Sequence, residues 1–350
     1  MEFKETLLTW YNTYKRDLPW RNTKNPYYIW LSEVILQQTR VEQGLPYYKK
    51  FVEEFPKIKD LAEANEEKVL KLWQGLGYYS RARNLHFTAK SILTKFNGTF
   101  PQEYEQVISL KGIGEYTAAA IVSFAYNKPY AVVDGNVYRV LSRYFGVDIP
   151  IDSSAGKKYF QELATSLLDK NNPGEFNQSI MEFGALQCVP KNPACNTCPF
   201  TASCMALSQN KIDSLPFKSQ KTKQRDRFFN YLVISKNEEL LINKRIENDI
   251  WQNLYDFPLI ETTLRTDEND LLTSQKWHDI FKDQPIRIKN ISKEYKHILS
   301  HQKIYAKFWH IEIDTYSKIL KGKYLQILHE NLFEYAVPKL IDNYLKQDKL

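Results

Sequence analysis

Four cysteines confined to one short segment are the feature that most restricts how this 350-residue chain can fold. They follow the pattern Cys188-x6-Cys195-x2-Cys198-x5-Cys204, and the chain has no other cysteine. A disulfide framework would spread its cysteines, whereas four thiolates within 17 residues can surround one soft metal centre. The spacing leaves open an iron–sulfur cluster, a four-cysteine zinc site and free buried cysteines, although a zinc ribbon more often pairs two C-x2-C knuckles.

The composition is that of a folded protein without a membrane anchor. Hydrophobic residues make up 43% of the chain and aromatic residues 14%, which is ample for real cores. The net charge of +7 fits a polyanionic partner without requiring one. No apolar run approaches the ~20 residues that span a bilayer, and the N-terminus has no signal-peptide core. We therefore expect no membrane partner and a location in a bacterial cytoplasm.

The composition and the hydrophobic pattern of the chain change after the cysteines, which predicts a multidomain protein. Residues 1–209 have apolar side chains at helical spacing and prolines at intervals suited to helices of about three turns, with helices expected at 117–125 and 136–144. Residues 210–227 are basic and poor in apolar side chains, which predicts a linker. In residues 228–350 we expect strands at 231–234, 240–242 and 303–313 and helices at 271–281 and 328–345, an α+β domain.

Two glycines, Gly112 and Gly114, lie between predicted helices in the run Leu110-Lys-Gly-Ile-Gly-Glu-Tyr116. Such a pair allows a tight hairpin with outward backbone amides, which can hold a phosphate without reading sequence. An ordinary turn at a helix end is the alternative. About twenty residues later, Asp134 precedes Gly135-Asn136-Val137, where it can cap a helix.

Two further segments carry polar, charged or aromatic side chains for which more than one role is open. Glu33 lies in a helical run but off the stripe formed by Val34 and Ile35, so a solvated surface carboxylate is the default. Residues 73–84 combine paired glycines, aromatics and arginines in a short turn, which suits insertion into a base stack and contacts to the DNA backbone. The alternative for that turn is an aromatic pair facing the core beside a solvated basic helix face.

Together, the hairpin, the segments around Glu33 and Asp134, the cysteine run and the strip 249–258 resemble MutY-type adenine DNA glycosylases over almost the whole chain. The resemblance implies an all-α helix-hairpin-helix glycosylase domain over 1–209, with the hairpin motif at about 108–125. A loop at 188–204 would hold a [4Fe–4S] cluster through the four cysteines. Residues 228–350 would form a Nudix-like domain that recognises 8-oxoguanine. They contain one glycine and no R-E-x-x-E-E run, so we expect a binder rather than a hydrolase.

The main rival is the endonuclease III branch, which shares the hairpin and the cluster but carries a lysine nucleophile two residues after the second hairpin glycine. Tyr116 stands there. Without the amine no Schiff base can form, so we expect no lyase activity. A DNA sensor or architectural protein is a third alternative. Binding alone requires neither Glu33 nor Asp134, which counts against it.

The resemblance implies excision of adenine mispaired with 8-oxoguanine or guanine, initiating base excision repair. The adenine is flipped out of the duplex. Glu33, with a raised pKa, would act as general acid toward N7. Asp134 would stabilise the oxocarbenium-like sugar, and Tyr116 and Asn136 would orient these groups.

The DNA contacts also follow from the resemblance. Tyr78 and Gln38 would wedge into the duplex and Gln178 would contact the extruded adenine, and we expect a monomer associated with the nucleoid. Further DNA contacts are expected at Arg21, Leu36, Gly112, Gly114, Arg81 and Arg83. The 8-oxoguanine loop would be His297-Ile-Leu299-Ser300-His301, in which Leu299 replaces the family's phenylalanine and stacks less well.

Overall fold

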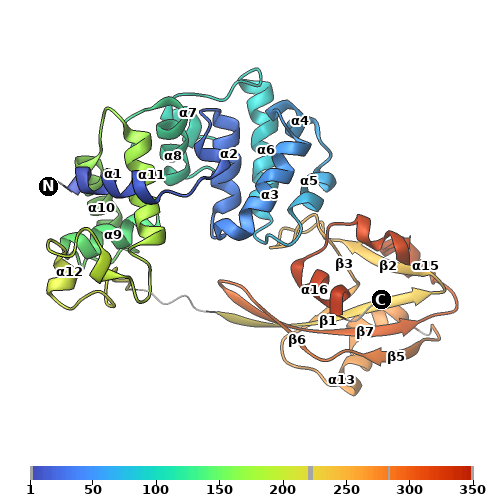
Figure 1. The fold of residues 1–350 in the computed structure, drawn as a ribbon. Helices are drawn as coiled ribbons and strands as arrows, with labels where there is room; N and C mark the ends of the chain where they lie inside the picture. The colour runs from blue at the N-terminus through green and yellow to red at the C-terminus, as the bar shows by residue number, and fades with distance from the viewer. Residues whose placement is uncertain (1–2, 220–223, 283, 348–350) are drawn as a thin grey trace. The chain divides into compact units, whose positions relative to one another are not determined.

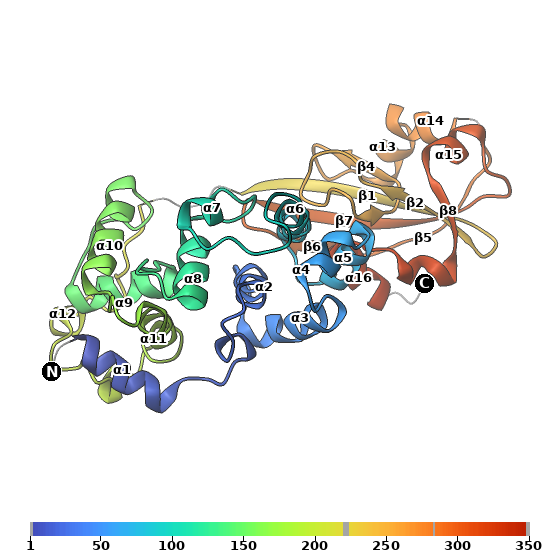
Figure 2. The same cartoon turned by 90° about the horizontal axis from the view of Figure 1, so that it is seen from above.

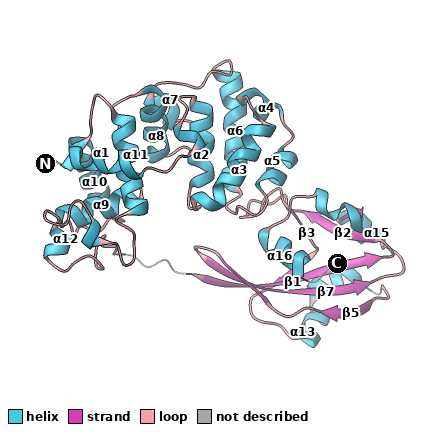
Figure 3. Ribbon diagram, viewed as in Figure 1, coloured by secondary structure: helices cyan, strands magenta, loops and turns pink. Residues whose placement is uncertain are grey.

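The computed structural model describes residues 3–219, 224–282 and 284–347, which form two compact units (Figure 1). One unit comprises the described residues of Met1–Glu63 and Asn84–Lys221, and the other those of Ala64–Arg83 and Thr222–Leu350. The first unit is helical and the second contains the strands (Figure 3). No described helix is long and apolar enough to cross a membrane.

The helical unit is built around α2 and α8, which pack against each other. Thr117 to Phe124 of α8 are all buried, as are most residues of α2, so both helices lie inside the unit. Gly146 ends α9 in the left-handed conformation, φ 67°, as expected for a glycine after a helix. The elements of this unit are α1 (Phe3–Tyr14), η1 (Pro19–Arg21), α2 (Pro26–Leu36), α3 (Val41–Glu54), α4 (Ile58–Glu63), α7 (Tyr104–Ile108), α8 (Glu115–Tyr126), α9 (Gly135–Phe145), α10 (Ser154–Leu167), α11 (Pro173–Leu186), η2 (Cys195–Thr197) and α12 (Met205–Ser208).

Residues 64–83 pack with the C-terminal part of the chain rather than with the helical unit. They contain α5 (Glu66–Trp73), which Asn65 caps, and the first turn of α6 (Ser80–Lys95), whose remainder lies in the helical unit.

The C-terminal part forms a mixed sheet in which β1 runs parallel to β7. The strand order is β3-β2-β1-β7-β5, β4 pairs with β1, β8 with β2, and β6 forms a hairpin with β7. The strands are β1 (Arg225–Lys236), β2 (Glu239–Lys244), β3 (Tyr255–Asp256), β4 (Leu259–Thr262), β5 (Arg287–Ile291), β6 (Tyr295–Ile298), β7 (Gln302–Glu312) and β8 (Leu325–Leu328). The helices are α13 (Glu268–Leu272), α14 (Gln275–Phe281), α15 (Lys318–Lys323), η3 (His329–Glu334) and α16 (Lys339–Gln347).

Both faces of this sheet are covered, which explains the unbroken buried run in the middle of β1. Leu232 pairs with Trp309, and both belong to the cluster that includes Trp277 of α14. On the opposite face, the ring of Phe308 stacks on Tyr344 of α16 with a centroid separation of 3.6 Å. Figure 2 shows α13 and α14 on one side of the sheet and α16 on the other.

Several element boundaries differ from the sequence expectation. The helix expected at 271–281 is two helices, because the Ser274 side chain caps α14 and starts it afresh. The helix expected at 328–345 begins only at Lys339, since a residue that precedes a proline, here Pro338, is disfavoured in a helix. In the basic stretch 210–227, Leu215 is buried and β1 already begins at Arg225.

Candidate active site

The helical unit contains a cavity of about 1590 Å³ that collects most of the expected site residues. Its walls include residues of α2, α8, α9, α10 and α11 and of the segments before and after α2. All four expected catalytic residues and five expected base or DNA contacts line it: Glu33, Tyr116, Asp134, Asn136, Arg21, Leu36, Gln38, Gly114 and Gln178.

Glu33 is buried in the last turn of α2, with 8% of its surface exposed, so it is not the solvated carboxylate that its position off the apolar stripe suggests. Tyr116 donates a hydrogen bond of 2.7 Å to its Oε2 atom. Burial raises the pKa of Glu33 to about 7, although the hydrogen bond from Tyr116 opposes this effect. The negative charge of Asp134 acts in the same direction as burial. The carboxyl group is thus poised to exchange a proton near neutral pH.

Asp134 is the N-cap of α9 as well as a cavity residue. Its Oδ1 accepts backbone N–H bonds from Asn136 at 2.9 Å and Val137 at 2.8 Å, and its Oδ2 accepts from the Asn136 amide at 2.7 Å. Burial raises the pKa of Asp134, while these hydrogen bonds counteract the rise. The cap therefore fixes the carboxylate in one orientation.

A glycine on α11 lets that helix approach Asn136. A Cβ atom at Gly184 would lie 2.7 Å from the Cβ of Asn136, closer than side chains tolerate. The side-chain oxygen Oδ1 of Asn136 also accepts a hydrogen bond from Arg139 at 2.9 Å, so both ends of its side-chain amide are engaged. This packing holds Asn136 beside Asp134.

Part of the cavity lining is an ion-pair cluster that the sequence did not reveal. Glu182, 1% exposed, accepts paired hydrogen bonds from both Arg16 and Arg21. Burial disfavours its ionisation, but these hydrogen bonds outweigh burial and lower its pKa to about 2. The hydroxyl of Tyr11 donates to Oε1 of Gln178 at 2.9 Å. The cluster holds Arg21 and Gln178, two expected base contacts, in fixed positions.

The glycine pair after α7 forms the expected hairpin. Gly112 has φ +81°, and a Cβ atom there would lie 2.7 Å from the Cβ of Asn84, so both conformation and space require glycine. The Ile113 amide donates to the Leu110 carbonyl at 3.1 Å, and Gly114 is the N-cap of α8. The hairpin is thus a tight turn between two helices.

The four cysteines form no disulfide and line one apolar cavity with Phe183, Phe200 and neighbouring side chains. Burial raises the pKa of Cys198 to about 11. Arg143 is buried beside them, with Nη1 3.5 Å from Sγ of Cys188. Its guanidinium also donates to the carbonyls of Val189, Pro190, Ile212 and Leu215. Among the described residues, no three His, Cys, Asp or Glu side chains are close enough to hold a single metal ion.

Family models match both parts of the sequence. Residues 31–165 match the HhH-GPD superfamily of base excision DNA repair proteins, and residues 230–347 match the NUDIX domain. The structure of a thermostable thymine-DNA glycosylase, 31% identical, aligns with a TM-score of 0.55 over 59% of this chain and 95% of its own. A non-covalent endonuclease III–DNA complex, 21% identical, aligns with a TM-score of 0.52 over 60% of this chain and 99% of its own, which shows a shared fold.

A relative that matches over most of its own length decides the family. The adenine DNA glycosylase of Buchnera aphidicola subsp. Baizongia pistaciae (strain Bp) is 38% identical over 311 residues, which is 87% of this chain and 84% of that protein. The chain belongs to the adenine DNA glycosylase family. The Arabidopsis thaliana adenine DNA glycosylase is 33% identical over 362 residues, 92% of this chain and 56% of that protein. The expected helix-hairpin-helix domain followed by a Nudix-like domain is confirmed, and the family acts in base excision repair.

The remaining expected DNA contacts of this glycosylase lie outside the cavity. Tyr78 is 45% exposed on the turn after α5. Arg81 is buried, and its guanidinium lies 5.2 Å from the ring centroid of Trp73. Arg83 donates to the Gln252 carbonyl at 2.8 Å. Of these three residues, only Tyr78 is exposed.

The expected 8-oxoguanine loop is the turn between β6 and β7. The Leu299 amide donates to the Gln302 carbonyl at 2.8 Å, which closes the turn. Ser300 and His301 are exposed, whereas burial lowers the pKa of His297 at the base of the hairpin. The turn therefore presents a hydroxyl and an apolar side chain beside each other.

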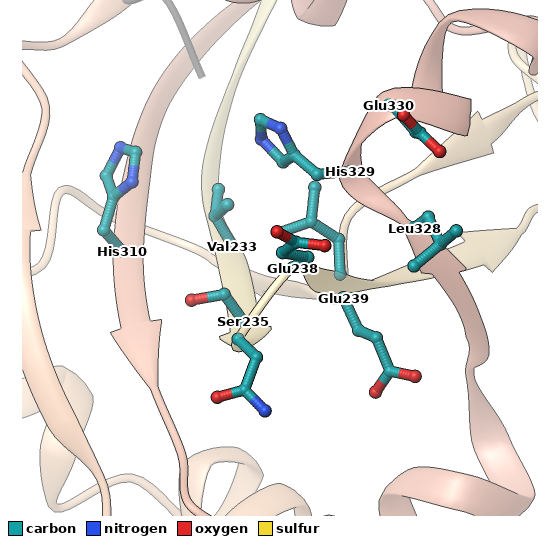
Figure 4. Close-up of a pocket in the computed structure, with 10 residues that line it drawn as sticks. Val233, Ser235, Glu238, Glu239, His310, Leu328, His329 and Glu330 are labelled. Atoms are coloured by element: carbon teal, nitrogen blue, oxygen red, sulfur yellow. The ribbon is translucent and has the colours of Figure 1, made fainter.

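A separate cavity of about 520 Å³ in the C-terminal unit contains none of the expected site residues (Figure 4). Its labelled side chains come from β1, the β1–β2 turn, β2, β7, β8 and η3. They include three carboxylates and two imidazoles: Glu238, Glu239, Glu330, His310 and His329. As elsewhere among the described residues, no three of these side chains are placed to hold a single metal ion.

Proposed function

We propose that this adenine DNA glycosylase excises adenine mispaired with 8-oxoguanine or guanine from double-stranded DNA, as a monomer and without cutting the strand. The observation that carries the proposal is the buried Glu33, with a pKa of about 7, in the same cavity as Asp134. One carboxyl group protonated near neutrality and another held in place by three hydrogen bonds are the acid and the charge stabiliser that glycosidic cleavage requires.

In the proposed reaction, the flipped adenine enters the cavity and Glu33 donates its proton to N7. The bond between N9 and the sugar C1′ then breaks, and its electron pair leaves with the neutral base. Asp134 stabilises the positive charge that develops on the sugar. Water adds to C1′ and releases a proton, which can restore Glu33. Asn136 and Tyr116 keep the two carboxyl groups oriented.

The base would be held by Gln178 and Arg21. Tyr11 and Glu182 engage those two side chains, so both are ordered before a base arrives. Gln38 and Tyr78, both with positive φ, would enter the duplex where the adenine has left it. Leu36, Gly112 and Gly114 would contact the DNA nearby. Arg81 donates to the Gly77 carbonyl and Arg83 to the Gln252 carbonyl, and both would contact the DNA backbone beside the turn that carries Tyr78.

Tyr116 supports a reaction without a lyase step. It stands where a bifunctional relative would carry a lysine, and its phenol is already bonded to Glu33. Burial raises the pKa of this phenol well above 10, so it offers no nucleophile at neutral pH. The abasic product would therefore stay intact until alkali breaks it.

Cys188, Cys195, Cys198 and Cys204 would hold a [4Fe–4S] cluster. They line one apolar cavity, and four cysteine thiolates are the ligands that such a cluster takes. When bound, it would cross-link the loop, and no step of the excision is assigned to it.

Recognition of 8-oxoguanine would fall to His297, Leu299, Ser300 and His301. The hydroxyl of Ser300 can donate to or accept from the altered base, and Leu299 can lie beside it. The Nudix-like domain would thus bind and not hydrolyse.

Single-turnover cleavage of duplexes with adenine opposite 8-oxoguanine, guanine or thymine tests the proposal. Strand breaks are scored with and without alkali. We expect excision fastest opposite 8-oxoguanine, with breaks that require alkali. Glu33→Gln should bind the same duplexes and lose excision by about 10²–10⁴-fold. Release of no adenine by folded, cluster-loaded protein, or breaks without alkali, would contradict the proposal.

A further inference from the structure

The turn of residues 74–79, here called the wedge turn, has a backbone that its own sequence does not fix. Gly75, Gly77 and Tyr78 have φ angles of 94°, 77° and 48°, all in the left-handed region. Glycine enters this region freely, but a tyrosine persists there only where surrounding contacts hold it. The conformation of Tyr78 therefore needs an external support.

That support comes from residues 335–342, which belong to the same compact unit as the wedge turn. Tyr79 is 2% exposed, and its hydroxyl accepts a hydrogen bond from the Gly75 amide at 3.2 Å. The same hydroxyl donates to the carbonyl of Val337 at 3.1 Å. One phenol thus ties both ends of the turn to this segment.

Gln74 and Lys339 form further hydrogen bonds between the wedge turn and residues 335–342. Gln74 donates from Nε2 to Oδ1 of Asp342 at 3.1 Å and accepts from the Val337 amide at 3.4 Å. Lys339 donates to the Gly75 carbonyl at 3.2 Å. The contacts hold the backbone of the wedge turn, and none of them involves the ring of Tyr78.

The ring of Tyr78 is left available on this fixed backbone. It is 45% exposed, with the guanidinium carbon of Arg81 5.4 Å from its centroid. Its hydroxyl shares a hydrogen bond of 2.9 Å with the hydroxyl of Ser300. The indole N–H of Trp73 donates to the Gly77 carbonyl at 2.9 Å. A group held in its binding conformation beforehand loses less entropy on insertion.

We infer that residues 335–342 are a positioning element for Tyr78, with Tyr79 and Gln74 as the positioning residues. The inference rests on the proposed role of Tyr78 as a wedge. It gives the C-terminal part a second task besides reading the base through residues 297–301. Positioning acts on entry into the base stack, so it should serve adenine opposite guanine and opposite 8-oxoguanine equally.

The test uses the full-length, cluster-loaded protein carrying Tyr79→Phe or Gln74→Met. Both changes keep side-chain volume and remove the hydrogen bonds to residues 335–342. Duplexes carry 2-aminopurine on either side of the base opposite adenine, where fluorescence rises when an inserted ring unstacks it. In these variants, we expect both the fluorescence rise and the single-turnover rate to be smaller than in the parent protein by about three- to tenfold, to the same extent on both mispairs.

Tyr126→Phe is the matched control, because the Tyr126 hydroxyl donates to the Phe100 carbonyl at 3.1 Å, far along the chain from the wedge turn. It should lower thermal stability comparably and leave fluorescence and rate unchanged. If Tyr79→Phe and Gln74→Met behave like this control, or slow only the 8-oxoguanine duplex, the positioning role is wrong. Tyr78→Ala should abolish the fluorescence rise that the parent protein gives. If the rise persists, the wedge role itself fails, and the inference with it.

Discussion

The hydroxyl of Tyr116 and the carboxyl group of Glu33 are joined by a hydrogen bond of 2.7 Å inside the cavity of the helical unit. The two side chains come from α8 and α2, which pack against each other in the interior. A hydrogen bond donated to a carboxylate favours its ionised form, so Tyr116 lowers the pKa that burial raises. The balance leaves the pKa of Glu33 at about 7, so the carboxyl group can be protonated before the reaction and ionised after it.

Replacing Tyr116 with phenylalanine should move the pH dependence of excision. Because the general acid must be protonated, the parent rate should fall as pH rises through about 7. Without the Tyr116 hydroxyl the pKa of Glu33 rises further, so the falling limb should shift to higher pH. Single-turnover rates across neutral pH measure this shift. A limb that stays in place, or moves to lower pH, would show that Tyr116 does not set the acidity of Glu33.

Glu33 should also make the stability of the protein depend on pH. Its pKa is about 7 in the folded protein against an ordinary value of 4.5, so the folded state binds the proton more tightly. Stability is therefore lost as pH rises from 4.5 through about 7. Glu33→Gln does not titrate, and above neutrality it should be more stable than the parent by up to about 3 kcal/mol. Thermal unfolding at acidic and alkaline pH measures the difference, and an equal difference at both would contradict the assignment.

The sequence predicted which residues gather in this cavity better than it predicted their surroundings. Glu33 and Asp134 follow from the motifs that carry the family resemblance. Periodicity could not show that Glu33 is buried, because α2 is covered on all sides and its apolar stripe does not mark one solvent face. Tyr11 and Glu182 escaped notice since their partners lie more than 150 residues away in sequence, and no local pattern records such a contact.

The fold was predictable to a similar depth. Alternating and helical patterns indicated the elements and the two classes of domain, but local capping decided where elements begin. Ser274 divides one expected helix, and Pro338 delays another. The assignment of residues 64–83 to the C-terminal unit depends on contacts such as that between Tyr79 and Val337, which exist only after folding.

Arg143 should be required for the integrity of the cysteine loop. Its guanidinium is buried and donates to four backbone carbonyls besides contacting Cys188. Arg143→Met fills similar volume but leaves those carbonyls without donors, at a cost of about 1–3 kcal/mol for each group that water cannot reach. We expect lower iron content per chain and a lower unfolding temperature. Lys191→Met, an exposed change in the same loop, serves as control. Full iron content in Arg143→Met would show that the loop is held by the cysteines alone.

Leu299 should limit how well the enzyme distinguishes 8-oxoguanine from guanine. It is a partly exposed side chain at the turn between β6 and β7, beside the hydroxyl of Ser300. A phenylalanine there would add aromatic stacking worth about 0.5–1.5 kcal/mol, or roughly two- to tenfold in rate. Leu299→Phe should therefore increase the ratio of single-turnover rates opposite 8-oxoguanine and guanine by that factor.

Ile298→Phe provides the matched comparison for this change, because the neighbouring Ile298 is 59% exposed and accepts the same added ring. If the turn reads the base through position 299, the ratio should rise in Leu299→Phe and stay unchanged in Ile298→Phe. A rise in both variants would mean that any aromatic on the hairpin strengthens DNA binding in general. No rise in either would mean that the hydroxyl of Ser300, and not stacking, carries the discrimination, and Ser300→Ala should then reduce the ratio toward one.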